Sequence, residues 1–233
     1  MNRTKIEWCD FTWNPITGCE HGCPYCYARR MAYRLRGRFG YPEDEPFRPT
    51  FHEDRLGEPL ELKRPSKIFT CSMGEMFGDW VPLPWVDKIL RVMWVCHHRR
   101  GHVFQVLTKT PQYIHFFIDV APPNLWLGVS VESARAEWRM KTLTDGTLKQ
   151  KGLKIAWASL EPLHGPVRIP KELDWIVIGA ETGNRKGRIE PREWWIKAIL
   201  AQADEHGIPV FMKDNLKPYW DGELLQEFPE VVR

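Results

Sequence analysis

Cys19, Cys23 and Cys26 form a C-x3-C-x2-C cluster near the start of the chain. Three thiols this close together cannot all pair with one another as disulfides, but they can all turn inward around one metal centre. Iron–sulfur clusters are held by Cys thiolates, usually four. Because this motif supplies three, one iron of a [4Fe–4S] cluster would lack a protein thiolate and could bind and activate a small molecule. The spacing therefore predicts an iron–sulfur centre with one open iron.

A zinc site is the alternative interpretation of the same cysteines. Structural zinc sites usually pair a C-x2-C motif with a second one or with spaced histidines. The chain has no second C-x2-C motif, and Cys71 and Cys96 lie far along it. His21 lies inside the motif and could serve as a fourth zinc ligand. Zinc therefore stays open beside the cluster, as do three incidental buried thiols.

Composition bounds the class of protein. A chain of 233 residues that is 43% hydrophobic can form one large α/β domain or two small ones around a sizeable core. No apolar run approaches the ~18 residues that a membrane span needs. A net charge of +3 does not by itself indicate a nucleic-acid partner. We expect a cytoplasmic protein without membrane contact, because a reducing compartment suits free thiols.

Apolar segments of strand length alternate with segments of helical periodicity along the chain. Strands are expected at residues 11–16, 67–71, 103–107, 125–131, 153–159, 175–179 and 208–212, and helices at 26–39, 84–97, 111–118, 134–143 and 191–206. This alternation implies a sheet of parallel strands. Six or seven such units are too few for an eight-fold barrel, so we expect an α/β fold of the open, partial (β/α)6-type barrel kind.

The pattern is interrupted once. Residues 41–65 contain five prolines and seven acidic residues, which indicates an inserted loop or lid. We therefore expect one domain over residues 1–233, with this insertion at about 41–65 and a short, irregular C-terminal tail at about 215–233. We also expect a monomer.

Polar side chains follow several of the predicted strands. In barrels of parallel strands, chemistry lies at the carboxyl ends of the strands. The side chains at those positions are Glu75, Lys109, Ser130, Glu132, Glu161, Glu181 and Lys213. Each one alone could be a helix cap or a solvated loop charge. Together they predict a functional rim.

The cysteine motif, with Tyr25 just before its last cysteine, resembles the signature of the radical S-adenosylmethionine (SAM) superfamily, C-x3-C-x-aromatic-C. The resemblance implies that the three thiolates bind a [4Fe–4S] cluster whose fourth iron binds SAM. It also implies the partial-barrel fold of that superfamily. A reductant such as flavodoxin or ferredoxin is then the expected protein partner.

The same resemblance implies a set of SAM-binding residues. The segment 72–75 is similar to the Gly-Gly-Glu motif of the superfamily, although Met73 replaces the first glycine. Gly74 and Glu75 are then expected to hold the amino group of SAM. The backbone at Tyr25 is expected to meet the adenine edge, and Ser130 or Glu132 the ribose.

A longer series of motifs resembles a radical SAM-like family that is common in bacteriophages and distantly similar to spore photoproduct lyase. The matching segments are 6–8 (IEW), 12–15 (TWNP), 18–19 (GC), 23 (C), 26–28 (CYA), 107–109 (LTK), 127–132 (LGVSVE), 159–163 (SLEPL) and 179–183 (GAETG). The resemblance spans roughly residues 5 to 215. If the protein is encoded by a phage, its compartment is the host cytoplasm.

The resemblance implies reductive cleavage of SAM to a 5′-deoxyadenosyl radical that takes a hydrogen atom from a substrate. We expect that substrate to be a nucleotide or a hypermodified DNA pyrimidine base undergoing isomerisation or rearrangement. Repair of a DNA photolesion by a lyase is the alternative within the same class. Lys109, Glu161, Glu181 and Lys213 are the expected catalytic residues, because opposite charges suit a zwitterionic reacting group.

Arginines decorate the first predicted helix. Arg30, Arg34 and Arg38 recur four residues apart and form a stripe, which is typical of phosphate contact. The alternative is a solvated face whose arginines pair with the acidic insertion. A different class of protein also stays open, namely a non-catalytic zinc- or cluster-bound module that binds nucleic acid. Metal analysis distinguishes the two: about four irons and four sulfides per chain would support the enzyme, and one zinc per chain would support the module.

Overall fold

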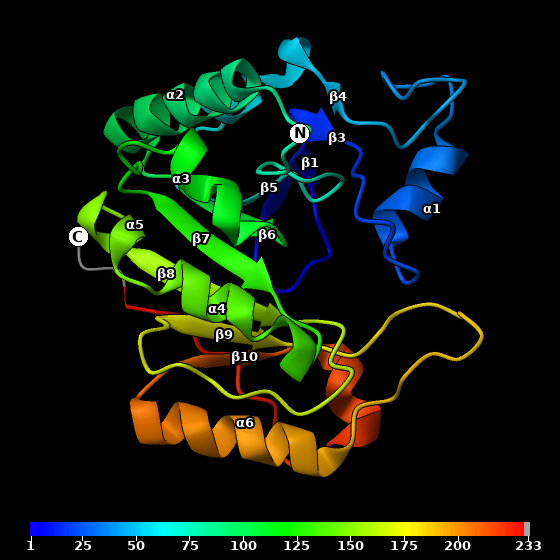
Figure 1. Cartoon of the computed structure of the whole chain (residues 1–233). Helices are drawn as coiled ribbons and strands as arrows, with labels where there is room; N and C mark the ends of the chain where they lie inside the picture. The colour runs from blue at the N-terminus through cyan, green and yellow to red at the C-terminus, as the bar shows by residue number, and fades with distance from the viewer. Residues whose placement is uncertain (231–233) are drawn as a thin grey trace. The chain divides into compact units, whose positions relative to one another are not determined.

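The computed structural model describes residues 1–230 of the chain (Figure 1). Residues 231–233, the end of the expected tail, lie outside the described residues. The chain forms two compact units: unit 1 is Met1–Trp126 with Lys151–Lys154, and unit 2 is Leu127–Gln150 with Ile155–Arg233. The single domain expected from the sequence stays a prediction.

Unit 1 contains mostly parallel strands. Its sheet strands, in spatial order, are β1 (Asn2–Arg3), β2 (Phe11–Trp13), β5 (Lys67–Thr70) and β6 (Val103–Thr108). β1 runs antiparallel to β2, whereas β2–β5 and β5–β6 are parallel pairs. A separate antiparallel pair joins β3 (Ile16–Thr17) to β4 (Thr50–Phe51). β2, β5 and β6 run in the same direction, so their carboxyl ends lie at one edge of the sheet. The cysteine motif, which follows β3, lies at that edge.

The helices of unit 1 are α1 (Tyr27–Arg34), α2 (Leu83–Arg100) and α3 (Ile114–Phe117). α2 buries one apolar side and ends where Gly101 adopts a left-handed conformation, with φ of 66°. The helix predicted over residues 26–39 is too long, because α1 ends at Arg34. Gly37, with φ of 66°, bends the chain away from the helical path soon afterwards.

The proline-rich insertion has structure of its own. Besides β4 it contains two short 3-10 helices, Glu53–Arg55 and Glu58–Glu61. Its buried His52 lies 2.8 Å from the Thr17 hydroxyl, between imidazole Nε2 and Oγ1. The Trp13 indole donates a hydrogen bond of 2.8 Å to the Arg55 carbonyl. The insertion is thus anchored to the strands that precede the cysteine motif.

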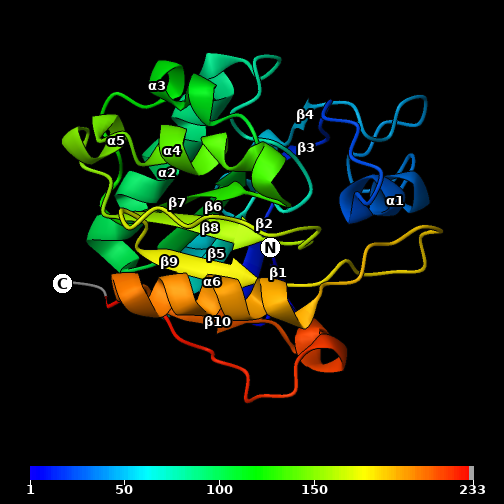
Figure 2. The same ribbon diagram turned by 60° about the horizontal axis from the view of Figure 1, so that its bottom comes forward.

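Unit 2 begins inside β7 (Leu125–Ser130), which is followed by further parallel strands. These are β8 (Ile155–Leu160), β9 (Trp175–Ile178) and β10 (Val210–Met212), and the helices are α4 (Trp138–Leu143), α5 (Thr147–Gln150) and α6 (Glu193–His206). β8–β9 and β9–β10 are parallel neighbours. α6 lies beside β9 and β10 in both ribbon views (Figures 1 and 2).

The largely aliphatic core of unit 2 contains two neighbouring tryptophans. The indoles of Trp157 and Trp175 are fully buried, with ring centroids 5.0 Å apart. A Cβ atom on Gly128 would lie 2.5 Å from the Trp157 ring, so β7 needs glycine there to let the indole pack. The density of tryptophan in the sequence thus serves packing at these positions.

The predicted fold class is confirmed. Strands alternate with helices, and the paired strands are mostly parallel, as in a partial barrel. Short elements that the sequence analysis did not predict are β1, β4 and α5. Across residues 1–230, every helix is too short or too polar to cross a membrane.

Candidate functional site

The cysteine loop, residues 18–26, joins β3 to α1. Its three cysteines are free and partly buried. The three other cysteines are buried: Cys9, Cys71 and Cys96. The His21 amide points at Cys19 Sγ at 3.5 Å, and the Arg29 amide points at Cys26 Sγ at 3.3 Å. Backbone N–H groups thus already face two of the three sulfurs.

The electrostatics of the loop suit a metal cluster. Burial raises the pKa of the Cys19 thiol to about 12, and the neighbouring charges of Glu75, Cys23 and Cys26 add to this rise. Three thiolates would therefore repel one another here unless a cation compensated them, and metal-bound thiols are deprotonated.

A zinc site stays open as the alternative to the cluster. Within residues 1–230, no three His, Cys, Asp or Glu side chains are grouped so that they could hold a metal ion, a finding that favours neither zinc nor an iron–sulfur cluster. His21, the possible fourth zinc ligand, instead faces the Glu75 carboxylate, with Nε2 at 3.1 Å from Oε2.

Gly74 brings the end of β5 against the cysteine loop. Gly18 and Gly74 form a parallel bridge, in which the Glu75 amide donates to the Gly18 carbonyl at 3.2 Å. A Cβ atom on Gly74 would lie 2.9 Å from the Gly18 carbonyl oxygen and 3.0 Å from that of Ile16. Glycine at position 74 therefore permits a backbone contact between segments far apart in the sequence.

Replacing Gly74 by alanine is expected to displace the cysteine loop, because the new methyl group meets backbone oxygens that cannot rotate away. We expect a loss of about 1–3 kcal/mol in the free energy of unfolding, as for overpacked sites, and a lower iron content after reconstitution. Urea denaturation and iron analysis measure the two effects. Gly57→Ala is the matched control, because a Cβ atom at that position would have nothing within 4 Å. Equal stability and iron content in both variants would contradict the prediction.

Glu75 is a buried acid of unit 1 that accepts several hydrogen bonds. Its side chain is 5% exposed. Oε1 accepts hydrogen bonds of 3.0 Å from the amides of Met76 and Phe77, and Oε2 accepts one of 3.1 Å from the Lys109 amide. Burial opposes ionisation, but the hydrogen bonds from His21 and the Phe77 amide outweigh it and lower the pKa of Glu75 below its usual value. The buried carboxylate is therefore charged at neutral pH.

Tyr25 and Lys109 lie next to each other. Lys109 Nζ donates to the Tyr25 hydroxyl at 2.8 Å. Since the Lys109 amide also binds Glu75, the ends of β5 and β6 both meet the cysteine loop. The structure thus brings together, within unit 1, the predicted residues Tyr25, Gly74, Glu75 and Lys109 beside the three cysteines. Their roles stay predictions.

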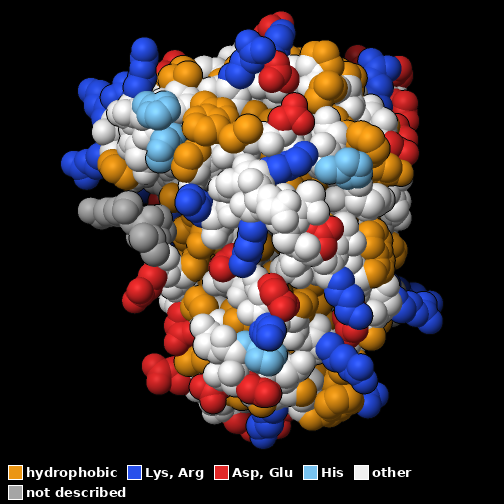
Figure 3. Space-filling view, turned by 60° about the vertical axis from the view of Figure 1, so that its left-hand side comes forward, with side chains coloured by type: hydrophobic (Ala, Val, Ile, Leu, Met, Phe, Trp, Pro, Cys, Tyr) orange, Lys and Arg blue, Asp and Glu red, His pale blue; other side chains and the backbone are white. Residues whose placement is uncertain are grey.

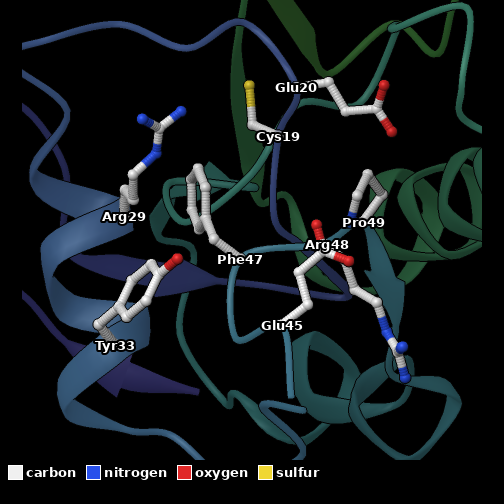
Figure 4. A pocket seen from close by; sticks show the side chains of 8 residues that line it. All are labelled: Cys19, Glu20, Arg29, Tyr33, Glu45, Phe47, Arg48 and Pro49. Carbon is white, nitrogen blue, oxygen red and sulfur yellow. The ribbon is translucent and has the colours of Figure 1, made fainter. Parts of the chain in front are cut away.

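A hollow of about 340 Å³ adjoins the cysteine loop (Figure 4). It lies between α1 and the segment 45–49 of the insertion. Its lining residues are Cys19, Glu20, Arg29, Tyr33, Glu45, Phe47, Arg48 and Pro49. The Arg29 guanidinium lies over the Phe47 ring, 5.7 Å from its centroid. The hollow thus combines aromatic walls with charges of both signs next to a predicted cluster ligand.

The predicted residues of unit 2 lie at the carboxyl ends of its strands, and they form ion pairs. Arg139 Nη1 donates to the Ser130 carbonyl at 2.7 Å and to Glu132 Oε2 at 3.0 Å. Lys213 Nζ lies 2.6 Å from Glu161 Oε1. Arg139 was not expected from the sequence, because it lies inside a helical segment and only the fold turns it back toward the end of β7.

Glu181 is the centre of a second polar group in unit 2. Its side chain is 2% exposed and contacts two basic side chains. The Arg185 guanidinium donates to both carboxylate oxygens, at 2.6 and 2.8 Å, and His164 Nε2 lies 2.9 Å from Oε2. The Arg185 bonds, helped by His164, hold the pKa of Glu181 below its usual value despite burial. His164 is a site candidate that the sequence analysis missed, although it closely follows the segment 159–163.

The chain matches the model of a protein family over residues 3–220. That family is described as protein of unknown function (DUF5131). No curated protein sequence matches the chain. A variant of spore photoproduct lyase with bound AdoMet and dinucleoside spore photoproduct resembles the fold, with a TM-score of 0.55 and 10% sequence identity.

Two further variants of spore photoproduct lyase give TM-scores of 0.54 and 0.53 at 10% and 11% identity, the first of them with dinucleoside spore photoproduct. Each of these matches covers 91% of this chain and 57% of the solved chain. The chain thus spans less than two thirds of the length of these proteins. The likeness agrees with the partial-barrel fold expected from the sequence.

Proposed function

The chain belongs to the DUF5131 family, and we propose that it is a radical SAM enzyme that holds a [4Fe–4S] cluster through Cys19, Cys23 and Cys26. One observation carries the proposal: three free, partly buried thiols lie in one loop, and Gly74 holds that loop against a buried, ionised carboxylate. The fold supports it, because a similar structure contains bound AdoMet.

The cluster, when bound, supplies the electron for reductive cleavage of SAM, which starts hydrogen abstraction from a substrate. The residues of the chain bind and orient the cofactor. The Glu75 carboxylate holds the SAM ammonium, because a buried cation requires a charged acceptor. The Tyr25 backbone meets the adenine edge, and Ser130 or Glu132 the ribose. The N–H groups facing Cys19 and Cys26 stabilise negative sulfur.

The substrate in this proposal is a nucleotide or a modified DNA pyrimidine that undergoes isomerisation, as expected for a phage-associated relative. Lys109, Glu161, Glu181 and Lys213 are the catalytic residues that the sequence predicts for it. Lys213 and Glu161 already pair with each other, so a zwitterionic group can exchange with both partners at once. Repair of a DNA photolesion is the second candidate, favoured by the dinucleoside photoproduct in a structure of similar fold.

Reduced protein is expected to convert SAM to methionine and 5′-deoxyadenosine, because the three thiolates leave one iron for the cofactor. The measurement is anaerobic incubation with dithionite and chromatography of the products, repeated with nucleosides and DNA to find what raises the yield. The Cys96→Ala protein, which lacks a buried thiol outside the loop, is the control and should retain activity. A fully loaded protein that released no 5′-deoxyadenosine under any condition would leave the non-catalytic module as the function.

A further inference from the structure

The segment 27–39 carries five arginines and no acidic residue. Arg30, Arg34, Arg36 and Arg38 are exposed to solvent. Of the three exposed aromatic side chains in this segment, Tyr33 at 52% and Phe39 at 72% lie next to these arginines. We call these six residues the arginine–aromatic face. It comprises α1 and the turn that follows, directly after the cysteine loop.

The arginines of this face are not neutralised by the acidic insertion. Among residues 1–230, no ion pair joins Arg30, Arg34, Arg36 or Arg38 to a carboxylate. The acids of the insertion have other partners: Asp44 Oδ2 lies 3.2 Å from Arg48 Nη1, Glu53 pairs with Lys88, and Glu58 pairs with the amino group of Met1. The face therefore presents positive charge that a polyanion can compensate. By contrast, the surface in Figure 3 shows acidic and basic side chains interspersed.

Phe39 is held in an unusual position. Its φ is 52°, a left-handed conformation that costs energy for a residue other than glycine. The turn around it is tied by hydrogen bonds from the Arg38 amide to the Leu35 carbonyl (2.9 Å) and from the Gly37 amide to the Tyr41 carbonyl (3.0 Å). The Arg55 guanidinium also binds the Phe39 carbonyl. Local structure thus holds an apolar ring in solvent, where it gains nothing from packing.

We propose that the arginine–aromatic face binds a single-stranded segment of DNA, with the arginines on phosphates and the rings of Tyr33 and Phe39 stacked on bases. Proteins that bind single strands combine a basic track with aromatic side chains in this way. The rings specify a single strand, because paired bases in a duplex do not offer their faces. The choice of DNA as the ligand rests on the proposed function. The added claim is that the strand binds on the arginine–aromatic face.

The hollow of Figure 4 connects this face to the cysteine loop. Tyr33 and Arg29 of α1 form one side of it, and Cys19 lies at its edge. A strand bound along α1 would therefore lie next to the predicted cluster. An acidic electron-carrier protein would also meet the arginines and could cover the rings, so the reduction assay must separate that partner from DNA.

The test measures DNA affinity of the full-length, anaerobically reconstituted protein. Fluorescence anisotropy is recorded with a labelled oligothymidylate of about 15 nucleotides, long enough for a typical site, and with the same strand in a duplex. The wild-type protein is expected to prefer the single strand. Arg30→Gln, Arg34→Gln and Arg38→Gln together should lower affinity and reduce the slope of log K against log salt by about 2, since each single-strand phosphate contact contributes ~0.7. Phe39→Ala should weaken binding about tenfold at one salt concentration.

Matched controls keep the result specific. Arg64→Gln, Arg99→Gln and Arg100→Gln remove the same charge from exposed positions outside the face. Phe116→Ala removes a ring that is 65% exposed elsewhere on unit 1. Circular dichroism should show unchanged folding for all variants. Equal losses in the test and control variants, equal affinity for duplex, or no binding of the oligonucleotide would overturn the proposal.

Two further outcomes separate this inference from the proposed function. If the face variants lose reduction by an acidic flavoprotein and bind oligonucleotide normally, the face binds a protein and the proposal is wrong. SAM cleavage is measured on the wild-type protein in parallel. Cleavage without DNA binding overturns this inference and leaves the proposed enzyme, whereas DNA binding without cleavage overturns the enzyme and supports the face.

Discussion

Alanine in place of Cys19, Cys23 or Cys26 is expected to abolish assembly of the iron–sulfur cluster. The wild-type protein, reconstituted without oxygen, should contain about four irons and four sulfides per chain and absorb broadly near ~400 nm. Each loop cysteine supplies one thiolate, and the other three cysteines are buried outside the loop sequence. Iron and sulfide analysis, with the absorbance spectrum, measures the loss.

Cys96→Ala is the control for this prediction. Cys96 is a free, buried cysteine of α2, so its replacement removes a thiol without touching the loop. That variant should keep the full cluster. One zinc per wild-type chain, with no sulfide, would instead support the zinc-bound module. A full cluster in the variant with alanine at Cys19, Cys23 and Cys26 together would show that these cysteines are not the cluster ligands.

Replacing Glu75 by alanine is expected to weaken SAM binding by about 2–3 kcal/mol, the worth of a hydrogen bond to a charged group, or about 30–150-fold in Kd. The carboxylate is buried and ionised, because backbone amides and His21 hold its pKa low. An ammonium group would replace one of its present donors, such as His21, and would meet a carboxylate that needs no deprotonation. Isothermal titration calorimetry of the cluster-loaded variant with SAM measures the change.

Two variants separate binding of SAM from support of the loop. Asp79→Asn removes an exposed acid close by in sequence and should leave SAM affinity unchanged. His21→Ala breaks the contact between the loop and Glu75 but keeps the carboxylate. If His21→Ala weakened SAM binding as much as Glu75→Ala does, Glu75 would act by holding the loop. Unchanged SAM affinity in the Glu75 variant would remove Glu75 from the cofactor site.

Several features of this protein could be predicted from sequence because they are local. The spacing of the loop cysteines is a property of eight consecutive residues, and it indicates a shared metal centre without any fold. Strand and helix patterns repeat over two to four residues, so the alternation that defines the fold class is visible along the chain. The strand-end positions of Lys109, Glu161 and Lys213 follow from the same patterns.

The contacts that build the site were decided by the tertiary structure. Gly74 meets Gly18, and Glu75 meets His21, across more than fifty residues, because the register of β5 brings the two segments together. The sequence showed Glu75 only as an acid after a strand. Its ionised state depends on amides that no local pattern reveals.

The same distinction explains the polar groups of unit 2 and the arginine–aromatic face. His164 and Glu181 belong to different strand ends, so their pairing depends on strand order. Sequence alone allowed the arginines of α1 to pair with the acidic insertion. The fold anchors that insertion to β3 and leaves those arginines without carboxylate partners in the part of the chain that the structure describes. Patterns along the chain determine which elements form, whereas side-chain partners depend on how those elements pack.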